Sequence, residues 1–191
     1  MHLTQKSKLA TVIHQQLANS ISLLRIILAP LLCYLIYNNI TGASWLMLCL
    51  ALSDGIDGYV ARNIGQETAL GKLLDPIADK VIAAFALLAI AIRSGSLTLY
   101  LCTALQLCRD LFFTHARISA YLKSAPQPAY PVTLVSKFKT ILLFLAIFLS
   151  ILGLEKQNLL VQNIANMLLC SSTIVSMYTL IRVKYPHQVY K

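Results

Sequence analysis

Long apolar runs dominate this sequence of 191 residues. A helix that crosses the hydrocarbon core of a bilayer needs about 20 predominantly apolar residues, and the chain contains six runs of roughly that length. Charged residues make up only 12% of the chain, against about 25% in soluble domains. We therefore predict an all-α integral membrane protein with six transmembrane helices. The predicted spans cover residues 19–38, 43–62, 71–92, 96–121, 135–153 and 158–181.

The segment before the first span has a different pattern. Leu9, Val12, Ile13 and Leu17 share one face of a helix over residues 3–17, which is typical of an amphipathic helix in the headgroup layer. The first apolar run is long enough to span and lacks an obvious small-residue cleavage site, so we expect no cleaved signal peptide. The chain then divides into an interfacial helix (1–18), a six-helix membrane domain (19–184) and a cytoplasmic tail (185–191).

Lysine and arginine are unevenly distributed between the two ends of the predicted spans. Both termini and the connections near 62–72 and 117–139 share one side and hold eleven basic residues, whereas the other side holds Arg93 and Lys156. Cytoplasmic segments carry such an excess of basic residues. We therefore expect both termini to be cytoplasmic. The net charge of +9 then reflects contact with the lipid bilayer, and we expect no nucleic-acid partner.

Carboxylates are scarce and clustered. The chain has only seven Asp and Glu residues, and five of them lie within 26 residues of mostly apolar sequence: Glu67 and the four aspartates Asp54, Asp57, Asp75 and Asp79. Residues three or four apart share one face of a helix, so each pair of aspartates faces one direction. The connector between the two helices is short, which favours adjacent antiparallel helices. Both acidic faces would then converge near the cytoplasmic surface.

Four carboxylates around one space would repel one another unless cations lie between them. Magnesium binds a few carboxylates together with phosphate oxygens, and two ions can clamp a phosphoryl group during displacement. Gly58, Ala61 and Gly71 would leave room for a nucleotide headgroup, and Arg62 would neutralise its phosphate oxygens. Small residues at such spacing also serve helix packing, and intramembrane carboxylates also serve transport. A membrane transporter or a non-catalytic membrane scaffold is therefore the alternative of a different class.

The same segment resembles the signature of the CDP-alcohol phosphatidyltransferase family, D-x2-D-G-x2-A-R-x8-G-x3-D-x3-D. All eight fixed positions match. The segment from Asn19 through Ser22 to Arg25 also resembles the family's first-helix pattern, Asn-x-x-Ser/Thr-x-x-Arg. The resemblance implies six membrane helices, an N-terminal interfacial helix and a homodimer. It further implies transfer of a phosphatidyl group from CDP-diacylglycerol to an alcohol, with release of CMP, in phospholipid biosynthesis.

The resemblance also implies roles for individual residues. Mg2+ or Mn2+, as two ions, would be held by Asp54, Asp57 and Asp75, with Asp79 near the second ion. Asp79 would also act as the general base on the acceptor hydroxyl. The residues expected to bind the CDP moiety are Asn19, Gly58, Ala61, Arg62 and Gly71.

Basic residues in the fourth and fifth predicted spans are candidates for binding the acceptor. Arg109, Lys137 and Lys139 could bind an anionic alcohol, although Arg109 could instead only pair with Asp110 and the lysines could only anchor a helix end. The segment Ser-Lys-x-Lys-Thr at 136–140 resembles a motif of bacterial phosphatidylglycerophosphate synthases, which use glycerol 3-phosphate. This resemblance implies that the protein lies in a bacterial inner membrane.

The Arg109-Asp110 pair departs from that pattern. The bacterial synthases usually carry Arg-Glu there. Arg-Asp, together with Pro131 upstream of Ser136-Lys137, is similar to cardiolipin synthases of the same family, which use phosphatidylglycerol. We predict glycerol 3-phosphate as the acceptor, with phosphatidylglycerol as the alternative.

Overall fold

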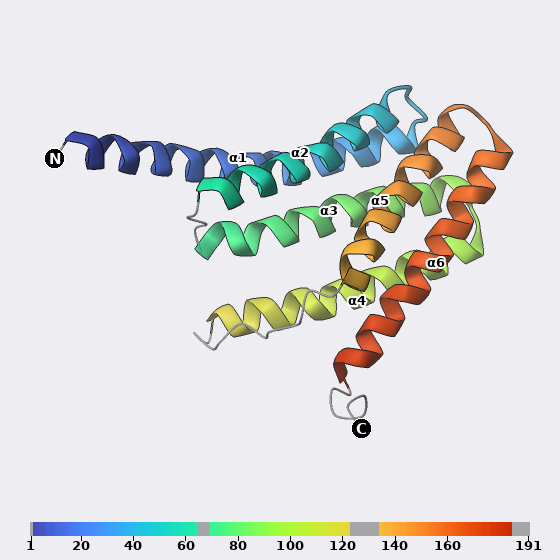
Figure 1. Ribbon diagram of the computed structural model, residues 1–191. Coiled ribbons are helices and arrows are strands. Elements are labelled where there is room, and N and C mark those ends of the chain that lie inside the picture. The colour runs from blue at the N-terminus through green and yellow to red at the C-terminus, as the bar shows by residue number, and fades with distance from the viewer. Residues whose placement is uncertain (1, 65–68, 123–133, 185–191) are drawn as a thin grey trace.

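The computed structural model describes residues 2–64, 69–122 and 134–184, and the side chains of residues 20–53, 77–116, 118–119 and 138–180. The described residues form six helices and no strand, as Figure 1 shows. The all-α prediction is confirmed, and one helix covers each predicted span. The helices are α1 (His2–Tyr37), α2 (Ala43–Ile64), α3 (Ala69–Ser94), α4 (Leu97–Leu122), α5 (Leu134–Glu155) and α6 (Leu159–Lys184).

The first helix is longer than the sequence suggested. The predicted interfacial segment is not a separate helix, because α1 continues unbroken from His2 to Tyr37. No glycine or proline precedes Pro30 in this stretch, so nothing in the local sequence ends the helix between the amphipathic segment and the apolar run. Pro30 lies inside the helix, where it removes one backbone hydrogen bond, a loss that membrane helices tolerate.

Three helices are long and apolar enough to cross a bilayer, as expected of a membrane protein. The stretches are Ser20–Tyr37, Phe138–Glu155 and Leu159–Leu180, and Ala43–Ser53 in α2 is a shorter apolar stretch. These lengths come from the described residues alone. The count of six spans therefore stays a prediction.

The core is built mainly from two helix pairs, α1 with α3 and α5 with α6. The α3 face in the core is rich in alanine, and Ala86 and Ala89 are almost completely buried together with Ile82 and Ile90. Small side chains allow the backbones of membrane helices to approach closely. Ala29 of α1 is also fully buried. This packing fixes α1 against α3, the helix that carries Asp79.

Three short connections turn the chain at one end of the molecule, at residues 38–42, 95–96 and 156–158. Gly95 follows the last turn of α3 with φ of +62°, a conformation that glycine adopts without steric cost. Asn158 caps α6, since its side-chain oxygen accepts hydrogen bonds from the backbone N–H groups of Leu160 and Val161 at 3.0 and 3.2 Å. These residues thus define the end of α3 and the start of α6.

Glu155 joins two of these connections. One carboxylate oxygen accepts hydrogen bonds from the backbone N–H groups of Gly42 and Ser44, both at 3.0 Å. The other accepts the Ser44 hydroxyl at 2.6 Å. Because the first N–H groups of a helix have no partner within it, a carboxylate at this position satisfies them and also favours the positive end of the α2 dipole. The last residue of α5 therefore fixes the start of α2.

Candidate active site

The motif with the four aspartates lies at the end of α2 and in the first turns of α3. Figure 1 shows these helices running in opposite directions, as predicted. Apart from Asp79, the motif side chains lie outside the residues whose side chains the structure describes, as do those of Asn19 and Lys137. Among the described side chains, no three His, Cys, Asp or Glu residues form a group that could hold a metal. The predicted metal cluster therefore stays a prediction.

Arg25 connects the two helices that carry the motif, α2 and α3. Its side chain is only 2% exposed, and one terminal nitrogen lies 3.5 Å from an oxygen of Asp79 in α3. Its Nε donates a hydrogen bond of 3.0 Å to the Ser53 hydroxyl oxygen in α2. Ser53 immediately precedes Asp54. A buried guanidinium from α1 thus contacts both motif helices.

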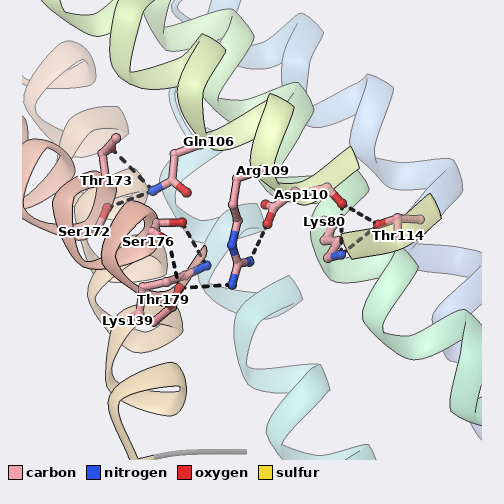
Figure 2. A network of polar contacts seen from close by, with 10 residues as sticks. All are labelled: Lys80, Gln106, Arg109, Asp110, Thr114, Lys139, Ser172, Thr173, Ser176 and Thr179. Atoms are coloured by element: carbon pink, nitrogen blue, oxygen red, sulfur yellow. Dashed lines mark hydrogen bonds and ion pairs between the residues drawn. The ribbon is translucent and has the colours of Figure 1, made fainter. Parts of the chain in front are cut away.

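Lys80 connects the motif to α4, as Figure 2 shows. Its ammonium group donates a hydrogen bond of 2.7 Å to the Thr114 hydroxyl and another of 3.1 Å to the Asp110 backbone carbonyl. The Thr114 hydroxyl donates to the same carbonyl at 2.7 Å. Because Lys80 follows Asp79 directly, these bonds hold the α3 segment that carries Asp79 against the Arg109-Asp110 segment of α4.

Arg109 lies between α4 and α6. It forms an ion pair with Asp110 at 2.7 Å, lies over the Phe113 ring at 4.3 Å from its centre, and reaches the Thr179 hydroxyl at 3.5 Å. The ion pair with Asp110, which was the alternative role considered for Arg109, is therefore present. One donor of Arg109 remains unpaired, because its buried Nε has no hydrogen-bond partner among the described residues. This part of the guanidinium can bind an anion that is not part of the chain.

Lys139 points to the same region from α5. It is only 4% exposed, and its ammonium group lies 3.5 Å from the Ser176 hydroxyl in α6. A lysine that only anchors a helix end would extend to the headgroups, so burial argues against that alternative for Lys139. Figure 2 shows Lys139 and Arg109 converging on the same part of α6.

Gln106 continues this polar layer one helical turn from Arg109. Its side-chain nitrogen donates to the hydroxyls of Ser172 and Thr173 at 3.2 and 3.5 Å. Its carbonyl oxygen is buried and has no hydrogen-bond partner among the described residues. Unpaired polar atoms are costly in the protein interior, so a buried unpaired acceptor one helical turn from a buried unpaired donor indicates a site for a polar ligand or water.

Three residues of this site were not among the predicted site residues. Arg25 was identified only as part of the first-helix pattern, and Lys80 and Gln106 were not singled out. The signal for all three was present in the sequence, since each is a strongly polar side chain within an apolar run, where polar residues are costly and usually functional.

The sequence pattern of the CDP-alcohol phosphatidyltransferase family matches residues 15–178. The chain belongs to this family. Its members are transferases that use divalent metal ions, and the match covers all four aspartates as well as Arg25, Arg109 and Lys139. The resemblance proposed from the motif is therefore confirmed.

Curated relatives carry two kinds of name. The chain is 37% identical to the "CDP-diacylglycerol--glycerol-3-phosphate 3-phosphatidyltransferase" of Aquifex aeolicus, over 68% of this chain and 71% of that protein. It is 28% identical to the Wigglesworthia glossinidia brevipalpis protein of the same name, over 79% of this chain and 84% of that protein. It is also 36% identical to the "Cardiolipin synthase (CMP-forming)" of Rattus norvegicus, over 58% of this chain and 36% of that protein. The transporter alternative finds no support among these relatives.

Proposed function

We propose that this protein transfers the phosphatidyl group of CDP-diacylglycerol to glycerol 3-phosphate, giving phosphatidylglycerophosphate and CMP. The observation that carries the proposal is the pair of cations Arg109 and Lys139, whose exposed fractions are 12% and 4% and which lie near the point where Lys80 joins α4 to the Asp79 segment of α3. Basic side chains within membrane segments are rare and mark substrate sites. The phosphate of a small anionic alcohol meets that need, and the names of the relatives agree with it.

The chemistry of the donor set fits a divalent metal. Asp54, Asp57, Asp75 and Asp79 offer only carboxylate oxygens, the ligands that Mg2+ and Mn2+ prefer. We propose that these four residues hold two ions. When bound, the ions would supply positive charge to the diphosphate of CDP-diacylglycerol. Asn19, Gly58, Ala61, Arg62 and Gly71 would bind the CDP moiety.

The chain's own residues then perform the transfer by positioning and proton removal. The Asp79 carboxylate takes the proton of the acceptor hydroxyl as the acceptor oxygen bonds to the β-phosphorus. The bond from that phosphorus to the oxygen bridging it to CMP breaks, and CMP leaves with the electron pair. Arg62 stabilises the charge on the departing phosphate. Arg109, Lys137 and Lys139 hold the acceptor phosphate.

A second acceptor is supported by one specific observation. Arg109 pairs with an aspartate, Asp110, at 2.7 Å, and the Arg-Asp pair is the pattern that resembles cardiolipin synthases. The rat relative carries that name. In this alternative the acceptor is phosphatidylglycerol, and the same cations would bind its phosphodiester.

The proposal includes a membrane arrangement. The six helices would form six spans over residues 19–184, with residues 1–18 at the interface and 185–191 as a cytoplasmic tail. Both termini and the active site would face the cytoplasm, because the basic residues concentrate at that end. In a bacterial cell the inner membrane would house the protein as a homodimer.

An acceptor panel on the purified protein tests the proposed function. CMP release is measured in detergent with CDP-diacylglycerol and Mg2+ or Mn2+, adding either glycerol 3-phosphate or phosphatidylglycerol. We expect release with glycerol 3-phosphate. Release with phosphatidylglycerol alone would replace this acceptor by the alternative, and no release with any alcohol would reject the transferase.

The metal-ligand role is tested by Asp75→Asn, which keeps the size of the side chain and removes its charge. We expect loss of CMP release from a protein that still elutes as the wild type in size-exclusion chromatography. Lys156→Gln is a matched control, because Lys156 is exposed at the opposite end of the molecule. Persistent release by Asp75→Asn would contradict the proposed metal site.

A further inference from the structure

Arg25 is held in one orientation by contacts with two helices. Its Nε donates to the Ser53 hydroxyl oxygen at 3.0 Å, and a terminal nitrogen lies 3.5 Å from Asp79. The Ser53 hydroxyl donates its own proton to the Leu50 carbonyl at 2.9 Å, so towards Arg25 it can only accept. Two anchors at different nitrogens fix the plane of a guanidinium, whose donors have a rigid geometry.

The two partners of this ion pair differ in burial. The Arg25 side chain is 2% exposed, whereas the Asp79 side chain is 26% exposed. The guanidinium therefore belongs to the protein interior, whereas about a quarter of the Asp79 side chain is exposed. A partly exposed carboxylate is in contact with a buried cation.

Stability alone does not account for a buried arginine at this position. Removing a guanidinium from water costs several kcal/mol, and apolar replacements of buried ion pairs are often neutral or stabilising. The neighbouring positions on α1 show that apolar packing is available here, since Ala29 and Leu32 are fully buried. A cation in this layer therefore indicates a requirement of the site.

We propose that Arg25 is a positioning residue for phosphatidyl transfer, which holds the Asp79 carboxylate in its reactive orientation from an anchor on Ser53. This inference rests on the proposed function, in which Asp79 removes the acceptor proton. The planar shape of the Arg25 guanidinium is then required in addition to its charge. A displacement of about 1 Å at a reacting group can lower the rate by roughly 100-fold.

The test compares Arg25→Lys, Ser53→Ala and the double variant. Lysine keeps the charge but cannot contact Ser53 and Asp79 with a fixed fork, so we expect kcat to fall by roughly 100-fold with KM for both substrates within about threefold of the wild type. Ser53→Ala keeps the arginine and removes its anchor, and kcat should fall by about threefold to tenfold. The double variant should resemble Arg25→Lys, because both changes break the same link.

Arg93→Lys is the matched control. Arg93 lies on the same helix as Asp79 but is exposed at the opposite end, where it donates to the Tyr37 carbonyl at 3.3 Å. Its kcat should equal that of the wild type. A loss confined to KM, additive effects in the double variant, or kcat within twofold of the wild type in Arg25→Lys would each overturn the inference.

The outcome is separable from that of the proposed function. An inactive wild type rejects the transferase, whereas an active wild type with an active Arg25→Lys rejects only the positioning role. Should Arg25→Lys fail to fold, Ser53→Ala decides the question. It is a small change at a half-buried hydroxyl, and an unchanged kcat in that variant contradicts the anchor.

Discussion

Replacing Glu155 with alanine should loosen the end of the molecule where three helical hairpins turn. The substitution removes the acceptor for two backbone N–H groups, on Gly42 and Ser44, and for the Ser44 hydroxyl. Among the described residues at this end of the molecule, no other side chain accepts three hydrogen bonds. The expected result is a protein of lower thermal stability with an intact active site.

The magnitude follows from the three hydrogen bonds. Losing the cap of a helix costs about 1 kcal/mol, and hydrogen bonds to a charged acceptor contribute about 1.5–3 kcal/mol each. Glu155 is half-buried, so water replaces part of the loss. We expect the free energy of unfolding to fall by about 2–4 kcal/mol. For a chain of this length each kcal/mol shifts the melting temperature by about 2–4 °C, which gives a decrease of roughly 4–16 °C.

The chain carries its own reporter for this experiment. Its single tryptophan, Trp45, follows Ser44 directly and is exposed, so its fluorescence responds to changes at the start of α2. The apparent melting temperature is measured in one detergent at a fixed scan rate, because membrane proteins often unfold irreversibly. Glu155→Gln keeps an oxygen acceptor without the charge and should give an intermediate decrease. Lys156→Ala, at the exposed neighbouring residue, is the control.

Two results would contradict this account. An unchanged melting temperature in Glu155→Ala would mean that the cap contributes nothing measurable. A loss of kcat at a temperature where the variant is folded would also conflict with it. Asp79 lies 15 residues before the end of α3, about 22 Å along the helix from the hairpin end.

Three further predictions concern other contacts. In Gly153→Ala the added Cβ would lie 2.8 Å from the Cγ and 3.0 Å from the backbone nitrogen of Gln162, so α5 and α6 must separate and the apparent melting temperature should fall by several degrees, the equivalent of about 1–3 kcal/mol. The Cys102 and Cys170 sulfur atoms lie 3.7 Å apart, so mild oxidation should join α4 to α6 by a disulfide, seen by mass spectrometry as a pair protected from alkylation. Lys139→Met should raise KM for the anionic acceptor by about 10-fold to 100-fold and leave KM for CDP-diacylglycerol unchanged, as measured by CMP release.

Each of these has an internal control. Cys49 and Cys108 are exposed and should remain open to alkylation after oxidation, and their protection together with the pair would point to non-specific crosslinking. Equal increases of both KM values in Lys139→Met would assign Lys139 a structural role. An unchanged melting temperature in Gly153→Ala would mean that the α5–α6 contact can relax without cost.

The helices could be predicted from the sequence because their lengths are set by the apolar runs. The predicted span 96–121 and the observed α4, Leu97–Leu122, differ by one residue at each end. The pairing of helices could not be predicted in the same way. Apolar residues surround most of each helix, so the pattern gives its length without indicating which face meets which neighbour. The contact of α1 with α3 depends on small side chains such as Ala86, which look ordinary in an apolar run.

The site could be predicted only in part for the same reason. Arg109 and Lys139 were recognisable as cations in apolar segments, and the structure brings both to α6. The contact of Arg25 with Asp79 depends on the rotation of α1 relative to α3. No spacing rule within one helix supplies that rotation, because residues three or four apart inform only about their own helix.

The described charged side chains divide into two groups along the helices. Six of the nine belong to the connected layer near the motif, and the other three, Arg93, Glu155 and Lys156, lie at the hairpin end. The core between the two groups is apolar and rich in alanine.

Because the groups share no contact among the described residues, their substitutions should add independently. Glu155→Ala should lower the melting temperature without changing kcat, Arg25→Lys should lower kcat more than its stability cost explains, and the double variant should combine both effects. Strong coupling between them would mean that the helices transmit displacement along their length and that the site is not supported locally.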